Sequence, residues 1–448
     1  MNLEYYSYIC TKYIEMERLI FKQLNDWRLS ENRKPLIIRG ARQVGKTWVL
    51  KEFGKRAYTN VAYINFEISK SLHNLFEADY NIERILFALK VESGIQIEPE
   101  NTLLIFDEIQ ECKGAITSLK YFYENAPQYH IIAAGSLLGV AMSGNTSFPV
   151  GKVNFLNIYP MSFVEFLGAL NENALIELLE KEDWELLKIF KSKYIEFLKI
   201  YFYVGGMPEV VQAYIDKKSI LQIREIQLEI LTAYEQDFSK HAPNEIVPRI
   251  RLVWQSIVSQ LSKENKKFIF GSLKKGARAK EFELALAWLV DAGLVYKINL
   301  ASKPAIPLVS YSESSAFKIF GVDVGLLSAM GDIDSKTLLD GNTIFEEFKG
   351  AIAEQFVLQQ LKSANNYHAC YWTNEKSTAE VDFIIQKNGV IIPIEVKASE
   401  NLQAKSLKAY CQKYQPSEAL RTSLSDFRKE EWLTNIPLYA IENYFRKK

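Results

Sequence analysis

The 448-residue chain is poor in cysteine and histidine, with four of each. Its cysteines, Cys10, Cys112, Cys370 and Cys411, lie far apart and form no C-x-x-C pair, which argues against a disulfide framework or a zinc site. Lysine plus arginine and aspartate plus glutamate both number 54, so the net charge is zero. Proteins that bind nucleic acid over their whole surface are usually basic, so any such contact must be local.

Long hydrophobic runs and targeting sequences are also absent. The longest apolar candidate, Leu284 to Tyr296, contains Asp291 and is too short to cross a bilayer. The N-terminal residues are rich in Tyr, Glu and Lys, which is not typical of a signal peptide. We therefore expect a cytoplasmic protein that does not bind a membrane, for which Met16 would also be a plausible start.

Strand and helix patterns alternate through the first third of the chain. Apolar strands are expected at residues 35–39, 61–66, 102–106 and 130–134, with helical stretches of ten or more residues between them. Such alternation predicts an α/β fold with a mostly parallel sheet. From residue 170 to 262 the pattern becomes helical.

A phosphate-binding pattern, G-x-x-x-x-G-K-T, follows the first expected strand. It comprises Gly40, Ala41, Arg42, Gln43, Val44, Gly45, Lys46 and Thr47. The two glycines allow a tight turn whose N–H groups can face the phosphates of ATP. Lys46 is expected to bridge the β- and γ-phosphates, and Thr47 to place its hydroxyl on Mg²⁺. A helix beginning at this point would add its favourable N-terminal field.

An apolar strand that ends in two carboxylates lies about 60 residues further on. Residues 103–106 are Leu-Leu-Ile-Phe, and Asp107 and Glu108 follow. This is the Walker B pattern, in which Asp107 would bind the magnesium ion and Glu108 would orient the attacking water. The next strand ends at Gly135 and Ser136. Ser136 is a candidate sensor of the γ-phosphate, although a simple strand-to-turn Gly-Ser is the alternative.

Several stretches together resemble a known family. They are GARQVGKT at 40–47, LLIFDEIQE at 103–111, AAGSLLGVAM at 133–142, SFPVGKVNFLNIYPMSFVEFL at 147–167, GGMPEVV at 205–211 and FGVDVGLL at 320–327. They are similar to bacterial and archaeal AAA+ ATPases that carry a C-terminal PD-(D/E)XK nuclease-like domain. The resemblance implies ATP hydrolysis with Mg²⁺. In similar proteins an arginine usually stands where this chain has Lys152, which lacks the planar, two-pronged donor group of an arginine finger.

Four domains are expected. They are a P-loop AAA+ domain (1–168), a helical lid (169–245), a winged-helix-like domain (246–335) and a restriction-endonuclease-like α/β domain (336–448).

Two expected C-terminal strands carry a second group of carboxylates. Asn388-Gly389 is a strong hairpin signal, so the strands around it should pair and bring Asp382 close to Glu395. Strand alternation places Glu395 and Lys397 on one face. In a nuclease, Asp382 and Glu395 would bind Mg²⁺ or Mn²⁺ with Glu354 as a further ligand, and Lys397 would act on the water. The alternative is an ordinary cross-strand Lys–carboxylate pair.

A basic segment precedes these strands. It contains Lys263, Lys266, Lys267, Lys274, Lys275, Arg278 and Lys280 within 18 residues. In a winged helix such a segment suits contact with the phosphates of DNA or RNA; the alternative is a solvated charge run.

Two functions remain open from the sequence. In the first, ATP hydrolysis controls a metal-dependent nuclease. In the second, ATP acts as a switch on a scaffold whose nuclease-like domain only binds nucleic acid or protein. A third function, a protein-remodelling ATPase whose C-terminal half is an adaptor, is less favoured because no substrate-pore loop is recognisable. A homo-oligomer is compatible with the first two.

Overall fold

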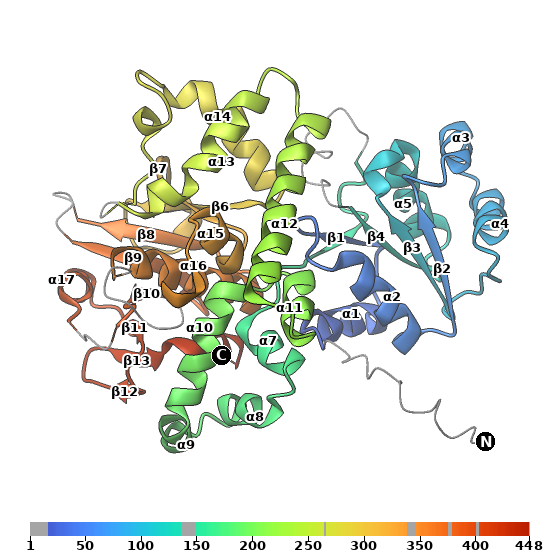
Figure 1. Cartoon of the computed structure of the whole chain (residues 1–448). Helices are drawn as coiled ribbons and strands as arrows, with labels where there is room; N and C mark the ends of the chain where they lie inside the picture. Colours follow the sequence, from blue (N-terminus) through green and yellow to red (C-terminus); the bar gives the residue numbers. More distant parts are fainter. Residues whose placement is uncertain are drawn as a thin grey trace, which may run out of the picture.

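The computed structural model describes residues 17–135, 148–263, 266–337, 346–374, 379–399 and 403–447. Its strands form two sheets, one of five strands in the N-terminal third and one of eight strands in the C-terminal half. Helices from the middle of the chain lie between the two sheets (Figure 1). Within the described residues, no helix is long and apolar enough to cross a membrane.

The five-stranded sheet is entirely parallel, with the order β2-β3-β4-β1-β5. Its strands are β1 (Leu36–Arg39), β2 (Asn60–Asn65), β3 (Thr102–Asp107), β4 (His130–Ala134) and β5 (Asn154–Asn157). All six residues of β3 are buried, as expected for a central strand that is covered on both faces. This α/β arrangement confirms the predicted parallel sheet.

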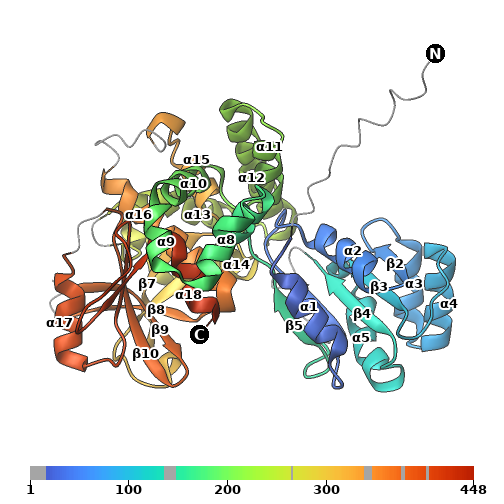
Figure 2. The ribbon, with the colours of Figure 1, turned by 90° about the horizontal axis from the view of Figure 1, so that it is seen from below.

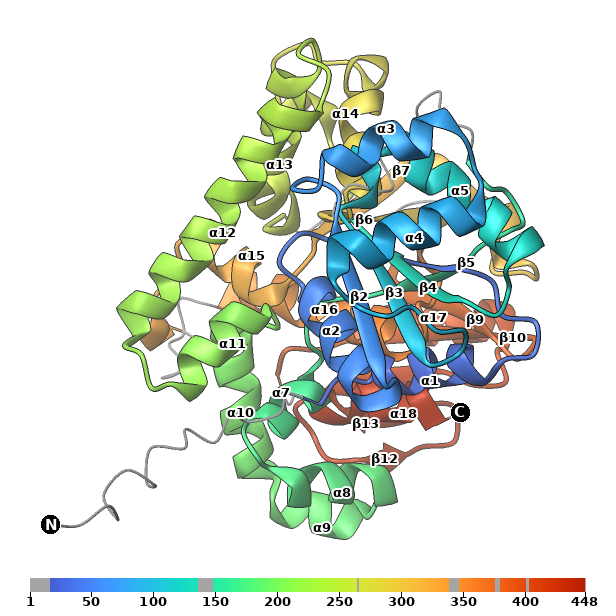
Figure 3. The same ribbon diagram turned by 90° about the vertical axis from the view of Figure 1, so that its right-hand side faces the viewer.

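Helices cover both faces of this sheet (Figure 3). The helices are α1 (Ile20–Leu29), α2 (Lys46–Ala57), α3 (Ser71–Ala78), α4 (Ile82–Ser93) and α5 (Lys113–Asn125). Alternate strand residues separate the two faces: Ile105 packs in the core that contains α1 and α2, whereas Phe106 packs in the core of α3, α4 and α5. The period of two along a buried strand explains this division.

The middle of the chain is helical. Its helices are α7 (Phe163–Ala169), α8 (Asn173–Lys181), α9 (Trp184–Ile189), α10 (Lys191–Val204), α11 (Pro208–Ile215), α12 (Ile220–His241), α13 (Val247–Leu261) and α14 (Ala279–Asp291). Sequence signals explain several of the starts: Ser162 with Glu165, and Ser219 with Gln222, form capping boxes, and Pro208 opens α11. The 22-residue α12 stands between the two halves (Figure 1).

The C-terminal sheet is mixed, with the order β12-β13-β11-β10-β9-β8-β6-β7. Its strands are β6 (Val295–Ala301), β7 (Ser312–Gly321), β8 (Ala369–Thr373), β9 (Glu380–Lys387), β10 (Val390–Val396), β11 (Leu420–Ser423), β12 (Arg428–Lys429) and β13 (Thr434–Pro437). Helices α15 (Val324–Met330), α16 (Glu346–Asn365), α17 (Lys405–Tyr414) and α18 (Ile441–Lys447) accompany it. In Figure 2, α17 covers one face, and α16 and α18 lie on the other.

The sheet continues across the boundary expected near residue 336. Hairpin β6–β7, which was expected to belong to a winged-helix-like unit, joins β8 through the pairs Asn299–Cys370 and Leu300–Tyr371. Residues on both sides of that boundary therefore share one sheet. The predicted β9–β10 hairpin is present, and Asn388 and Gly389 both have positive φ, at 48° and 77°.

Candidate functional site

The predicted phosphate-binding loop connects β1 to α2. Gly45 immediately precedes α2 and has a left-handed conformation with φ of 90°, which glycine adopts without steric cost. Gly40 is required for a different reason, because a Cβ atom there would lie 2.4 Å from the Ile158 carbonyl oxygen. The helix begins at Lys46, so its free N–H groups face the loop as predicted.

Lys46 is 7% exposed and points into the loop. Its Nζ donates hydrogen bonds to the carbonyl oxygens of Gly40, at 2.9 Å, and Ala41, at 2.7 Å. Burial lowers the pKa of Lys46 to about 8, although the nearby charges of Glu108 and Asp107 act in the opposite direction. An ammonium group in this position is available to a phosphate anion that enters the loop.

The predicted Walker B carboxylates lie beside the start of α2. Thr47 Oγ1 donates a 2.7 Å hydrogen bond to Asp107 Oδ2, and the Tyr63 hydroxyl donates one of 2.8 Å to the same oxygen. Glu108 has a positive φ of 47°, and its Oε2 accepts a 2.5 Å hydrogen bond from Gln110 Nε2. A hydroxyl and a carboxylate at this separation are suitable oxygen ligands for Mg²⁺.

An arginine that sequence reasoning did not identify braces the loop. Arg18 is 4% exposed, and its Nε donates a 3.0 Å hydrogen bond to Glu165 Oε1. Its other nitrogens donate to the carbonyl oxygens of Val44, in the loop, and Tyr159. The pairing spans 147 residues, so no local pattern could have indicated it.

Later parts of the chain also contact the loop. Arg42 forms a 2.5 Å ion pair with Asp237 of α12, and the Tyr234 hydroxyl of α12 donates to the Arg42 carbonyl oxygen at 2.9 Å. The turn between α14 and β6 comes close as well: a Cβ atom on Gly293 would lie 3.3 Å from the Ala41 nitrogen. The helical middle of the chain therefore contacts the predicted nucleotide site directly.

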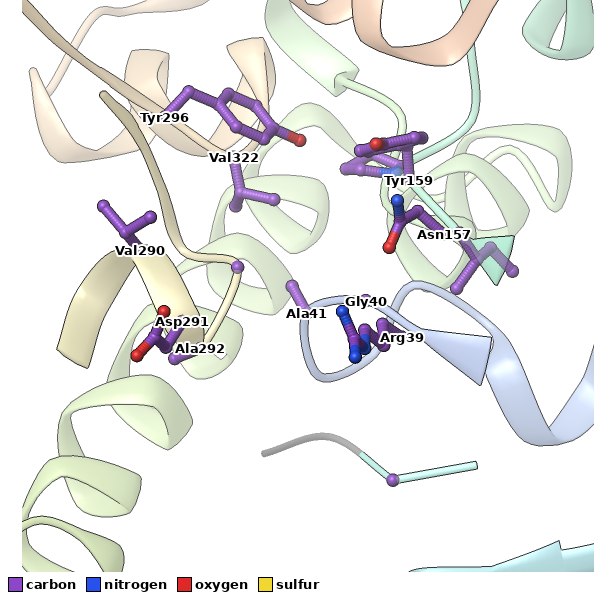
Figure 4. Close-up of a pocket in the computed structure, with 14 residues that line it drawn as sticks. Arg39, Gly40, Ala41, Asn157, Tyr159, Val290, Asp291, Ala292, Tyr296 and Val322 are labelled. Atoms are coloured by element: carbon purple, nitrogen blue, oxygen red, sulfur yellow. The ribbon is translucent and has the colours of Figure 1, made fainter. Parts of the chain in front are cut away.

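A cavity of about 250 Å³ lies where these parts meet (Figure 4). The loop residues Gly40 and Ala41 form one wall, and the end of α14 and Tyr296 of β6 form another. Tyr159 lines the cavity from the segment after β5, with its ring centroid 6.5 Å from that of Tyr296. A small space thus separates part of the loop from the middle region.

The structure locates only one of the two remaining candidates, Lys152, relative to the loop. Ser136 lies outside the described residues. Lys152 pairs with Glu124 at 2.9 Å, and its neighbour Gly151 accepts a hydrogen bond from Lys34, which precedes β1. Because the loop follows β1, Lys152 lies at the opposite end of the strand from the phosphate site. It therefore does not stand in for an arginine finger at the loop of its own chain.

The C-terminal carboxylates are brought together from α16, β9 and β10. We use the name carboxylate cluster for Glu354, Asp382 and Glu395. Asp382 Oδ2 accepts a 2.8 Å hydrogen bond from the Val396 nitrogen, and Lys397 Nζ lies 2.8 Å from Glu395 Oε1. Burial, with the charges of Glu354 and Glu395, raises the pKa of Asp382 well above its ordinary value. The predicted convergence of these side chains is therefore seen in their geometry and mutual electrostatics.

Two lysines that the sequence motif does not include also reach this cluster. Lys266 forms an ion pair with Glu354, and Lys318 of β7 lies 4.0 Å from the other oxygen of Glu354 and 2.5 Å from Glu380. Burial alone would raise the pKa of Glu354, but the ammonium groups of these lysines outweigh it and lower the pKa. Among the residues that the structure describes, no group of three His, Cys, Asp or Glu side chains is arranged to hold a metal ion.

The basic segment is mostly at the surface. Lys267, Lys274, Lys275, Arg278 and Lys280 are at least partly exposed around the start of α14. Phe268, an apolar residue of the same segment, is buried instead: it is 5% exposed and stacks on Phe317 of β7. Phe268 therefore anchors the segment, and these five charged side chains lie toward solvent, whereas Lys266 is paired with Glu354.

Comparison with protein families agrees with the loop geometry. Residues 32–167 match the model of the AAA domain. The N-terminal third of the chain therefore contains an AAA domain. This assignment implies binding of ATP and Mg²⁺. Residues 195–337 match a domain of unknown function (DUF8612), and residues 349–441 match another (DUF4143).

Solved structures and curated proteins add little more. Cdc6p of Pyrobaculum aerophilum is 12% identical, with 74% of this chain and 97% of that chain covered and a TM-score of 0.27. A RuvB variant of Thermotoga maritima is 13% identical, with 64% and 89% covered and a TM-score of 0.29. Orc1 of Aeropyrum pernix, solved in complex with DNA, is 11% identical, with 70% and 90% covered and a TM-score of 0.25. No curated protein matches the chain.

Proposed function

We propose that this chain hydrolyses ATP in its AAA domain to control its C-terminal half, which acts as a metal-dependent nuclease-like module on nucleic acid. The observation that carries the proposal is the gathering of Glu354, Asp382 and Glu395 from three separate elements beside Lys397. Carboxylates are rarely buried together without a cation. In this proposal α13, α14 and hairpin β6–β7 act as a winged-helix-like unit that contacts DNA or RNA through the basic segment.

At the ATP site, each residue has a defined role in the proposal. Lys46 and the loop N–H groups hold the phosphates, and Thr47 and Asp107 hold Mg²⁺, which neutralises charge on the phosphates when bound. Glu108 orients the water, since its backbone directs it past Asp107. The 2.7 Å contact between Thr47 and Asp107 supports this assignment, because both oxygens already lie together at the end of the loop.

At the C-terminal site, the residues fit a divalent ion in part. Glu354 and Glu395 are each 5% exposed, and within the described structure the Oε2 atom of each accepts no hydrogen bond. The three carboxylates would hold Mg²⁺ or Mn²⁺, which would activate water and offset charge on a phosphodiester. Lys397 would position that water. The lysines at Glu354 favour the alternative, in which the module only binds nucleic acid and ATP acts as a switch.

Cleavage assays distinguish the two functions. Purified protein is incubated with plasmid, single-stranded DNA and RNA, with Mg²⁺ or Mn²⁺, and with or without ATP. We expect metal-dependent cleavage that responds to ATP, and that is lost in Asp382→Ala and Lys397→Ala while nucleic-acid binding remains. The response to ATP should disappear in Lys46→Ala. Failure to cleave any substrate, with binding intact, would contradict the nuclease and leave the switch.

A further inference from the structure

Glu354 receives an ammonium group from each of two different elements. Lys318 comes from β7, and Lys266 comes from the segment between α13 and Phe268. Neither residue belongs to the strand motif of Asp382, Glu395 and Lys397. Together they add two positive charges beside the carboxylate cluster.

The two lysines are held very differently. The side chain of Lys318 is 0% exposed, contacts Glu380 at 2.5 Å and lies 5.0 Å from the ring centroid of Tyr371. The side chain of Lys266 is 13% exposed, and its neighbour Lys267 is exposed. Lys318 is thus a fixed counter-charge within the sheet, whereas Lys266 reaches the cluster from the boundary with solvent.

A divalent ion at this cluster would bind the Glu354 carboxylate, whose Oε1 atom is already paired with Lys266. Mg²⁺ and Mn²⁺ bind carboxylate oxygens directly, and an ammonium group on the same carboxylate repels the ion and competes with it for the negative charge. A ligand binds with reduced apparent affinity when the protein must first leave its stable state to become able to bind. The lysine contact also agrees with the lack of a ready-made metal arrangement among the described residues.

We propose that Lys266 is a built-in competitor for the divalent cation: its ammonium group holds Glu354 in the metal-free protein and must leave before the ion binds. Lys266 is therefore a positioning residue that opposes binding of the ion. This inference rests on the proposed metal site but requires no cleavage.

The test is Mn²⁺ binding to the full-length protein without nucleotide, monitored by electron paramagnetic resonance or calorimetry. Lys266→Met should bind Mn²⁺ at least about tenfold more tightly than wild type, and the gain should vanish in Lys266→Met with Asp382→Asn. Lys266→Gln, which keeps a donor without the charge, is a second variant in case the first folds poorly. Lys303→Met, an exposed lysine in the same half, should bind like wild type.

Thermal unfolding separates competition from a structural role. Removal of Lys266 leaves Glu354 with less counter-charge, so Lys266→Met should be less stable without metal and should regain stability with Mn²⁺. Lower stability with unchanged Mn²⁺ affinity would overturn the inference while leaving the metal site intact. No Mn²⁺ binding at the cluster in any variant would overturn both the inference and the proposed nuclease site.

Discussion

The proposed mechanism of ATP hydrolysis depends most strongly on Glu108. A positive φ of 47° is uncommon for a residue with a side chain, and such conformations cluster at functional sites. The Glu108 nitrogen donates a 3.1 Å hydrogen bond to Asp107 Oδ1, so the side chain of Asp107 helps to hold this turn. The carboxylate is thereby directed beyond the strand, beside the residues proposed to hold the phosphates and Mg²⁺.

We predict that Glu108→Gln retains ATP binding but hydrolyses ATP about a hundredfold more slowly, the scale expected when a residue that activates water is lost. Glutamine preserves the shape and the contact with Gln110 but cannot accept a proton. Phosphate release at saturating ATP measures the rate, and a fluorescent ATP analogue measures the affinity. Lys46→Ala serves as the control that loses binding. Unchanged turnover in Glu108→Gln would remove the role of Glu108.

At the scale of elements, the last helix is attached to the AAA domain by a buried carboxyl group. Glu442 of α18 is 1% exposed, and its Oε2 accepts a 3.3 Å hydrogen bond from the Val164 nitrogen at the start of α7. Burial, only partly offset by Arg446, raises the pKa of Glu442 to about 7. The folded protein therefore retains a proton on Glu442 that the unfolded chain releases above about pH 4.5.

This shift makes stability depend on pH. Below the pKa of the unfolded chain, Glu442 is protonated in both states and does not change the free energy of unfolding. As pH rises, the buried group increasingly destabilises the fold. Above about pH 7 this destabilisation is complete and amounts to roughly 3 kcal/mol. We predict that Glu442→Gln raises the melting temperature at pH 8 and changes it little at pH 4.5. An equal change at both pH values, in thermal unfolding followed by circular dichroism, would contradict a buried ionisable group.

Local elements were predictable where short patterns determine them, as two cases show. The glycines and Lys46 indicate the loop, and Asn388-Gly389 indicates the β9–β10 hairpin, since both depend on neighbouring residues. The joining of β6 to β8 was not predictable, because Asn299 pairs with Cys370 across 71 residues, from 299 to 370. Nothing in the alternation of either strand identifies its partner.

In the candidate sites, too, the sequence identifies only those residues that belong to a short local pattern. Asp107, Asp382 and Glu395 end or interrupt apolar strands, so the sequence identifies them. Arg18 and Lys318 carry no such signal, because each acts through a fold that brings distant segments together. In the sequence, a single lysine within a strand such as β7 is typical of a surface residue. Only the folded sheet shows that it is buried.

At the scale of the whole molecule, α16 connects the two sites. It carries Glu354 at the carboxylate cluster, and further along the helix Gln359 donates hydrogen bonds to Asp323, at 3.0 Å, and to the Tyr201 hydroxyl, at 2.9 Å. Asp323 in turn accepts a 2.7 Å hydrogen bond from the Gly206 nitrogen. Pro208, two residues after Gly206, lies beside Gly45 of the loop. A continuous series of contacts thus joins the ATP site to α16, the helix that carries Glu354.

The central claim is that nucleotide at the loop is sensed by the parts of the chain beyond the AAA domain, and hydrogen–deuterium exchange tests it most directly. With a non-hydrolysable ATP analogue and Mg²⁺, backbone exchange should slow in the loop, in α12 near Tyr234 and Asp237, and at the turn around Gly293. Exchange in α17 should not change, and Lys46→Ala should show none of these effects. Protection confined to the AAA domain, with α12 and the Gly293 turn unaffected, would contradict the account.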